Sequence, residues 1–148
     1  MKKILFILLL FPLAFMSCSD DTPEENKEFE NITTTLDDEL ILTWKTVLIN
    51  SENEYQDFVK LYIDKLHRET ETPEKSGVNF SKNSIIMVHG ASNGGIQNID
   101  KKLEKHDGNY YIDIRILRDA TFGGKGWYVG YTVPKITNEK VNVNVRYE

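Results

Sequence analysis

The sequence predicts a single α+β domain in which one amphipathic helix packs on a mostly antiparallel, twisted sheet or partial barrel of about six strands. Three observations predict this fold. Residues 55–66 carry apolar side chains at helical spacing, whereas several later segments alternate apolar with polar residues. An Asp-Gly pair between two such segments is typical of a hairpin. Residues 39–148 are enough for one domain with one core.

The first elements are a strand and a helix. Residues 40–49 are rich in Trp, Val, Ile and Thr, which favours a strand. Ser51 and Glu54 then form a capping box, the pattern that starts a helix. The apolar face of this helix, which we expect to be buried in the core, consists of Tyr55, Phe58, Val59, Tyr62 and Leu66.

The rest of the domain is predicted to be strands. Residues 84–89 form a continuous apolar run, typical of a strand buried on both faces, which Gly90 should end. Residues 96–104 and 109–117 should pair around Asp107 and Gly108, because turn residues of this type tolerate positive φ. Residues 127–133 form a further strand, and residues 141–147 alternate apolar with polar side chains, as expected of a sheet with one solvated face.

The N-terminal residues predict a lipoprotein. Lys2 and Lys3 precede the apolar residues 4–16, a run shorter than the about 20 residues that a membrane-spanning helix needs. Small Ser17 precedes Cys18, so the order is that of a cleavable export signal. It resembles the bacterial lipoprotein signal, with residues 1–17 as the signal peptide and Cys18 as the lipidated residue. An ordinary secretory signal is the alternative.

Residues 18–38 are predicted to be an acidic, flexible tether, because this polar segment cannot bury apolar surface. The serine and acidic cluster directly after Cys18 resembles the surface-export signal of lipoproteins in Bacteroidetes-type bacteria. We therefore expect an outer-membrane protein, held by acyl chains on Cys18 and facing the cell surface. The alternatives are a domain that faces the periplasm and a solvated tether without a surface-export signal.

Composition and motifs give no sign of catalysis. Acidic residues outnumber basic ones by 23 to 18, so nucleic acid is not an expected partner. Cys18 is the only cysteine, and His67, His89 and His106 lack the spacing of metal ligands. The GGKG stretch at residues 123–126 lacks the Ser or Thr of a phosphate loop. We expect a protein that is not an enzyme and holds no metal or cofactor.

Two glycine-rich loops, residues 90–95 and 120–126, form the candidate binding site. Glycines let a partner approach the backbone closely, and loops held by a rigid sheet often carry recognition. The alternative is ordinary turn geometry with a tryptophan in the core. The candidate partner-binding residues are Asn93, Gly94, Gly95, Phe122, Gly123, Gly124, Lys125, Trp127 and Tyr128.

Three short stretches, residues 78–82 (VNFSK), 93–96 (NGGI) and 131–135 (YTVPK), lie at the start, in the middle and near the end of residues 78–145. With these stretches, residues 78–145 resemble the C-terminal domain of the PrcB family of accessory lipoproteins, although Asn79 stands where the family has Asp and Ile96 where it has Tyr. This resemblance implies a non-catalytic subunit that binds another exported protein, such as a protease.

Two other functions remain open at this point. The loops resemble, more loosely, those of chagasin-type cysteine-protease inhibitors, which would make the chain a loop-based inhibitor. A glycan or small-ligand binder would stack its ligand on Phe122, Trp127 and Tyr128.

Overall fold

The computed structural model describes residues 27–32, 44–65, 70 and 72–148. The predicted signal peptide and Cys18 lie outside this part of the chain. In chain order the elements are β1 (Glu28–Ile32), β2 (Trp44–Ile49), α1 (Glu52–Lys65), β3 (Asn83–Ser92), β4 (Ile96–His106), β5 (Asn109–Arg118), β6 (Lys125–Pro134) and β7 (Val141–Tyr147).

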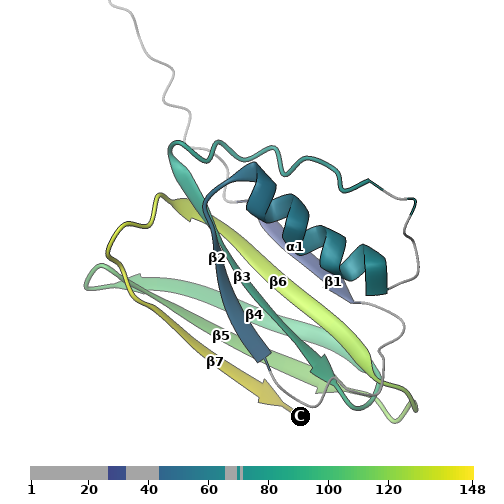
Figure 1. The fold of residues 1–148 in the computed structure, drawn as a ribbon. Coiled ribbons are helices and arrows are strands. Elements are labelled where there is room, and N and C mark those ends of the chain that lie inside the picture. The colour runs from purple at the N-terminus through teal and green to yellow at the C-terminus, as the bar shows by residue number, and fades with distance from the viewer. Residues whose placement is uncertain (1–26, 33–43, 66–69, 71) are drawn as a thin grey trace, which may run out of the picture.

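These elements form three layers (Figure 1). The middle layer is a four-stranded antiparallel sheet with the order β1-β6-β3-β2. Helix α1 covers one face of it, and a three-stranded sheet with the order β4-β5-β7 lies on the other. In the smaller sheet β4 and β5 are antiparallel, whereas β5 and β7 are parallel.

The predicted fold class is therefore wrong: the protein is mostly β, with seven described strands in two sheets instead of about six in one. The error has a physical cause. Alternation in the sequence reports which face of a strand is buried, but the same alternation suits a strand that packs on a helix or on a second sheet. The chain changes sheets three times, between β3 and β4, between β5 and β6 and between β6 and β7.

The larger core lies between the two sheets. Its buried side chains are Ile86, Val88, Ile99, Tyr110, Ile112, Ile114, Ile116, Trp127, Val129, Tyr131 and Val133. A smaller core under α1 consists of Ile49, Phe58, Tyr62, Ile85 and Met87. Strand β3 contributes to both cores, which confirms the prediction that its apolar run is buried on both faces.

The capping box at the start of α1 is confirmed, with a shift of one residue. The backbone N–H of Glu54 donates to Ser51 Oγ over 3.2 Å. In return Glu54 Oε2 accepts the N–H of Asn50, over 2.6 Å, and not that of Ser51. Two backbone donors, one just before the helix and one in its first turn, are thus bonded. The predicted apolar face of the helix packs on the sheet, apart from Leu66, which lies outside the described residues.

The hairpin between β4 and β5 is also confirmed. His106 pairs with Asn109, and the two residues between them have positive φ, 50° at Asp107 and 76° at Gly108. This is the turn expected from an Asp-Gly pair, and its twist matches that of the flanking strands.

The largest differences from the predicted strands concern β3 and β1. β3 continues through Gly90 to Ser92, because its pairing with β6 extends to the register pair Ser92 and Lys125. β1 lies within residues 18–38, where the sequence predicts only a tether, and it pairs with β6 at the edge of the larger sheet. Among the described residues, no helix is long and apolar enough to cross a membrane.

Candidate functional site

The two glycine-rich loops meet at one end of the sandwich. Residues 93–95 connect β3 to β4, and residues 119–124 connect β5 to β6, so both loops pass from one sheet to the other. The N–H of Gly95 donates to the carbonyl of Thr121, and the N–H of Asp119 donates to the carbonyl of Gly95, each over 3.1 Å. The sequence predicts two loops, and the structure joins them into one surface.

Gly95 is required at this junction. A Cβ atom there would lie 1.9 Å from Asp119 Oδ1 and 2.0 Å from Thr121 Oγ1, so any side chain would displace these two groups, which are hydrogen-bonded to each other. Gly123 has a different role, since its φ of 112° is a conformation that residues with a side chain rarely adopt. The glycines therefore hold the loops in contact and allow the second loop to turn.

Asp119 organises the second loop. Its carboxylate accepts hydrogen bonds from the hydroxyl of Thr121 and from the backbone N–H of Thr121, the latter over 2.9 Å. These bonds, with a smaller contribution from Lys125, lower the pKa of Asp119 below its usual range. The carboxylate is therefore ionised at neutral pH. Because its pKa is lowered on folding, its contribution to loop order is present at neutral pH and is lost as the pH falls through the lowered pKa.

The joined loops enclose an open hollow of about 400 Å³. Its lining residues are Asn93, Gly94, Arg118, Asp119, Ala120, Thr121, Phe122 and Glu148. Arg118 Nη1 donates to Asn93 Oδ1 over 3.2 Å, so this side chain links the two loops across the hollow. The backbone N–H of Arg118 donates to the carbonyl of Glu148 over 2.8 Å, which joins the end of β7 to the same rim.

Phe122 is the most exposed large apolar side chain among the described residues, and its ring is fully open to solvent. It lies between the Asp119–Thr121 turn and Gly123, on a loop whose base is bonded to Gly95. A phenylalanine in this position does not contribute to the core. An exposed aromatic ring on a braced loop is typical of an anchor that a protein partner buries.

The predicted site residues divide into three groups. Asn93, Gly94, Gly95, Phe122, Gly123 and Gly124 lie in the two loops, and Lys125 begins β6. Trp127 is 0% exposed and lies between the sheets, so it is a core residue, as the alternative interpretation proposed. Tyr128 lies on the other face of β6, with its ring centroid 5.6 Å from that of Phe58 and 5.0 Å from that of Tyr62. Phe122, Trp127 and Tyr128 therefore share no surface on which a sugar could stack.

Five of the residues that line the hollow were not among the predicted site residues: Arg118, Asp119, Ala120, Thr121 and Glu148. Asp119 could have been found from the sequence, because Asp followed two residues later by Thr is typical of a side-chain-capped turn. Glu148 could not, because its place beside Arg118 depends on the parallel pairing of β7 with β5.

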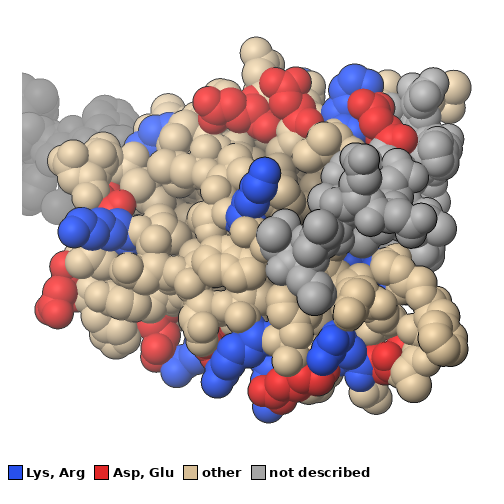
Figure 2. Space-filling model, turned by 60° about the horizontal axis from the view of Figure 1, so that its bottom comes forward, with Lys and Arg blue, Asp and Glu red and all other residues tan. Residues whose placement is uncertain are grey.

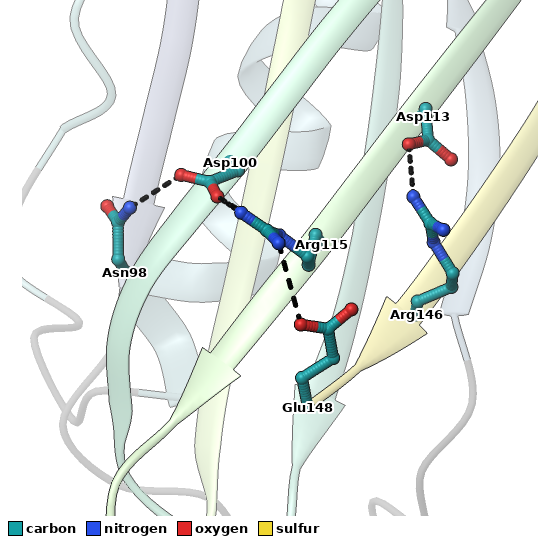
Figure 3. Close-up of polar contacts among 6 residues, drawn as sticks. All are labelled: Asn98, Asp100, Asp113, Arg115, Arg146 and Glu148. Carbon is teal, nitrogen blue, oxygen red and sulfur yellow. Dashed lines mark hydrogen bonds and ion pairs between the residues drawn. The ribbon is translucent and has the colours of Figure 1, made fainter.

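A polar network extends from the hollow over the outer face of the smaller sheet (Figure 3). Arg115 pairs with Asp100 of β4, and its Nη1 lies 3.6 Å from Glu148 Oε2. Arg146 of β7 donates to Asp113 Oδ2 over 2.6 Å. The sequence favours a surface pair between Asp113 and Arg115, but in the structure each pairs with a residue of a neighbouring strand. These exposed pairs orient the strands and contribute little to stability.

The stretches that resemble the PrcB family have a structural role. Lys135 Nζ donates to the carbonyls of Phe80 and Asn50 over 3.0 and 3.1 Å, and its backbone N–H donates to the carbonyl of Lys82. The first and last matching stretches therefore lie side by side. Asn79 accepts hydrogen bonds from the N–H and the hydroxyl of Ser81, which the carboxylate of an Asp could accept equally well.

His89 and the metal-binding residue types are placed as follows in the described part of the chain. The His89 ring lies 5.4 Å from that of Phe58 and 6.0 Å from that of Tyr62, in the layer between α1 and the sheet. Within the described residues, no three His, Cys, Asp or Glu side chains are grouped as metal ligands would be. Comparison of the chain with protein-family models, with curated proteins and with solved structures found no match.

Proposed function

We propose that this chain is a lipid-anchored, exported module that binds another exported protein on the joined loops and is not itself an enzyme. The observation that carries the proposal is the exposed ring of Phe122 on a loop fixed at its base by Gly95, Asp119 and Thr121. A preformed loop loses little conformational entropy on binding, and burying a Phe side chain yields about 1.5–3 kcal/mol.

The partner proposed first is an exported protease, on the basis of the resemblance to the PrcB family. The hollow beside Phe122 supplies side chains of both charges, the basic Arg118 and the acidic Asp119 and Glu148. An apolar anchor with a polar rim is the usual composition of a specific protein interface. The proposed location is the outer membrane, with the module on the cell surface.

The proposed anchor predicts that Cys18→Ala moves the protein from the membrane fraction to the soluble fraction. Acyl chains on Cys18 are its only proposed attachment, and two or more chains are needed for stable anchoring. The measurement is fractionation by ultracentrifugation, with intact mass analysis of the native protein. Ser19→Ala is the matched control and should stay in the membrane fraction. An unmodified thiol in the native protein would contradict the anchor.

The proposed binding site predicts that Phe122→Ala weakens retention of the partner at least tenfold, a loss of about 1.4 kcal/mol or more. The measurement is a quantitative pull-down from envelope extracts of cells that produce the chain. Leu61→Ala is the matched control, because Leu61 is also an exposed apolar residue but lies on α1. Equal retention by wild type and Phe122→Ala would exclude the loops as the binding site.

A further inference from the structure

The two sheets of the sandwich differ in width by one strand. Counted over the described residues, the larger sheet has four strands and the smaller has three. β4 lies on the side of β1, because Lys101 Nζ lies 3.4 Å from Glu28 Oε2 and also pairs with Glu30. β7, at the opposite edge of the smaller sheet, therefore lies on the side of β2. Since β1 and β2 are the two edges of the wider sheet, β2 extends beyond β7.

The inner face of β2 is only partly covered by the described part of the chain. Leu48 is in register with Ile86, and Trp44 with Gly90, so both side chains point toward the smaller sheet. Ile86 is 0% exposed in the core between the sheets, whereas Trp44 and Leu48 are 37% and 39% exposed. Two large apolar side chains therefore face a position where a fourth strand of the smaller sheet would lie.

The edge of β7 presents the backbone groups that such a strand needs. Lys140 O accepts the N–H of Tyr110, and Glu148 N–H donates to the carbonyl of Ile116, so the even-numbered residues bond to β5. Backbone groups alternate in direction along a strand. The N–H and C=O groups that point away from β5 are therefore those of Val141, Val143, Val145 and Tyr147. Among the described strands, β7 pairs only with β5.

Charge indicates which segment would fit. β2 and β7 contain Lys45 and Arg146 and no acidic residue. Figure 2, which turns the lower side of Figure 1 toward the viewer, shows a mostly uncharged centre with one basic side chain, and charged rows above and below it. A strand beside β7 would place its outward side chains next to Asn142, Asn144 and Arg146. Arg146 already pairs with Asp113 through Nη2, so an acidic residue there would bind the other N–H donors of its guanidinium.

We propose that an extended segment of a partner protein adds to β7 as the fourth strand of the smaller sheet, beneath β2. Its inward residues are apolar and cover Trp44 and Leu48, and its outward residues include at least one carboxylate. Main-chain hydrogen bonds supply affinity and the alternating side chains supply specificity, as in other cases of strand addition. This inference rests on protein binding as the function, but on a surface other than Phe122.

A second copy of the chain fits this position poorly. Antiparallel pairing of two β7 strands would place the four-stranded sheets of both copies on the same side of the joined sheet. Each β2 would then occupy the space of the other copy's β3, because β2 extends one strand beyond β7. A single extended segment meets no such obstacle.

The test uses the full mature chain in detergent and a fluorescent, end-blocked peptide of seven residues that alternates valine with glutamate and threonine. A peptide of the same composition with its valines contiguous is the control. Fluorescence anisotropy should show binding of the alternating peptide alone, with slower hydrogen exchange at the amides of Val143 and Val145. Val143→Pro should weaken binding at least tenfold, because it removes an outward N–H but no bond to β5. Val143→Ile keeps that N–H and should bind as the wild type does.

Leu48→Glu is a second variant, which should also prevent binding by placing a carboxylate over the added strand. Phe122→Ala should bind the peptide normally, so failure of this proposal can be told from failure of the loop site. No binding by the wild type, or equal binding of the two peptides, would overturn the proposal. A dimer in sedimentation velocity that Val143→Pro dissociates would also overturn it, since the occupant would then be a second copy.

Discussion

Replacing Trp127 with alanine is expected to lower the free energy of unfolding by about 3–5 kcal/mol, the usual cost of deleting a large buried aromatic ring. The ring is 0% exposed and fills the space above Gly90. It also lies edge to face with Tyr147 of β7, at a centroid distance of 6.4 Å, so it connects the two sheets. The cavity left by alanine would be bordered by both sheets. Chemical denaturation of wild type and variant measures the difference.

Phe122→Ala is the matched control for this experiment. It removes an aromatic ring five residues away in the sequence, but the ring is fully exposed. Its effect on the free energy of unfolding should stay within about 0.5 kcal/mol. If the two variants lost similar stability, Trp127 would not be the core residue that the structure describes.

Gly90→Val is expected to lower the free energy of unfolding by about 1–3 kcal/mol. A Cβ at this position would lie 2.8 Å from Cζ2 of Trp127 and 3.1 Å from Cβ of Trp44, and the buried indole has no room to move. Strand propensity alone predicts the opposite result, because valine is favoured in strands and glycine is not. The experiment therefore separates packing from propensity.

The control for Gly90→Val is Thr46→Val in β2. Thr46 is exposed, so the same β-branched residue should change the free energy of unfolding by no more than about 0.5 kcal/mol there. A Gly90→Val variant as stable as the wild type in thermal and chemical denaturation would show that the indole does not lie over Gly90.

The fold explains why the candidate site lies where it does. Both loops are crossings between the sheets at the same end of the sandwich, so Gly95 and Thr121 can bond although they are distant in sequence. The sheets give the loop bases a rigid support, and Phe122 projects from that support. The open edge at β7 begins beside the same hollow, since Glu148 follows Tyr147 and lines it.

Local features were predicted well because they depend on neighbouring residues. The helix follows from the cap at Ser51 and the apolar face that includes Phe58. The hairpin follows from Asp107 and Gly108, whose positive φ values satisfy the turn. In each case the interacting groups lie within a few residues of one another, so the local residue pattern is enough to predict the element.

Pairings between distant segments were predicted poorly. The number of sheets was wrong, β1 was not predicted, and Trp127 was assigned to a binding surface although it lies between the sheets. Alternation along β6 separates two sets of side chains, one on each face of the strand. It does not show that Trp127 and Val129 lie between the sheets whereas Tyr128 lies under the helix.

The sequence by itself determined the helix, most of the strands and the hairpin of this protein, and it contains the apolar run and Cys18 from which the proposed anchor is inferred. Only the tertiary structure decided that the strands divide into two sheets of unequal width, that the two loops share one hollow and that β2 extends beyond β7. The reason is physical: propensity and capping act over a few residues, whereas sheet partners are selected by burial and hydrogen bonding between segments far apart in the chain.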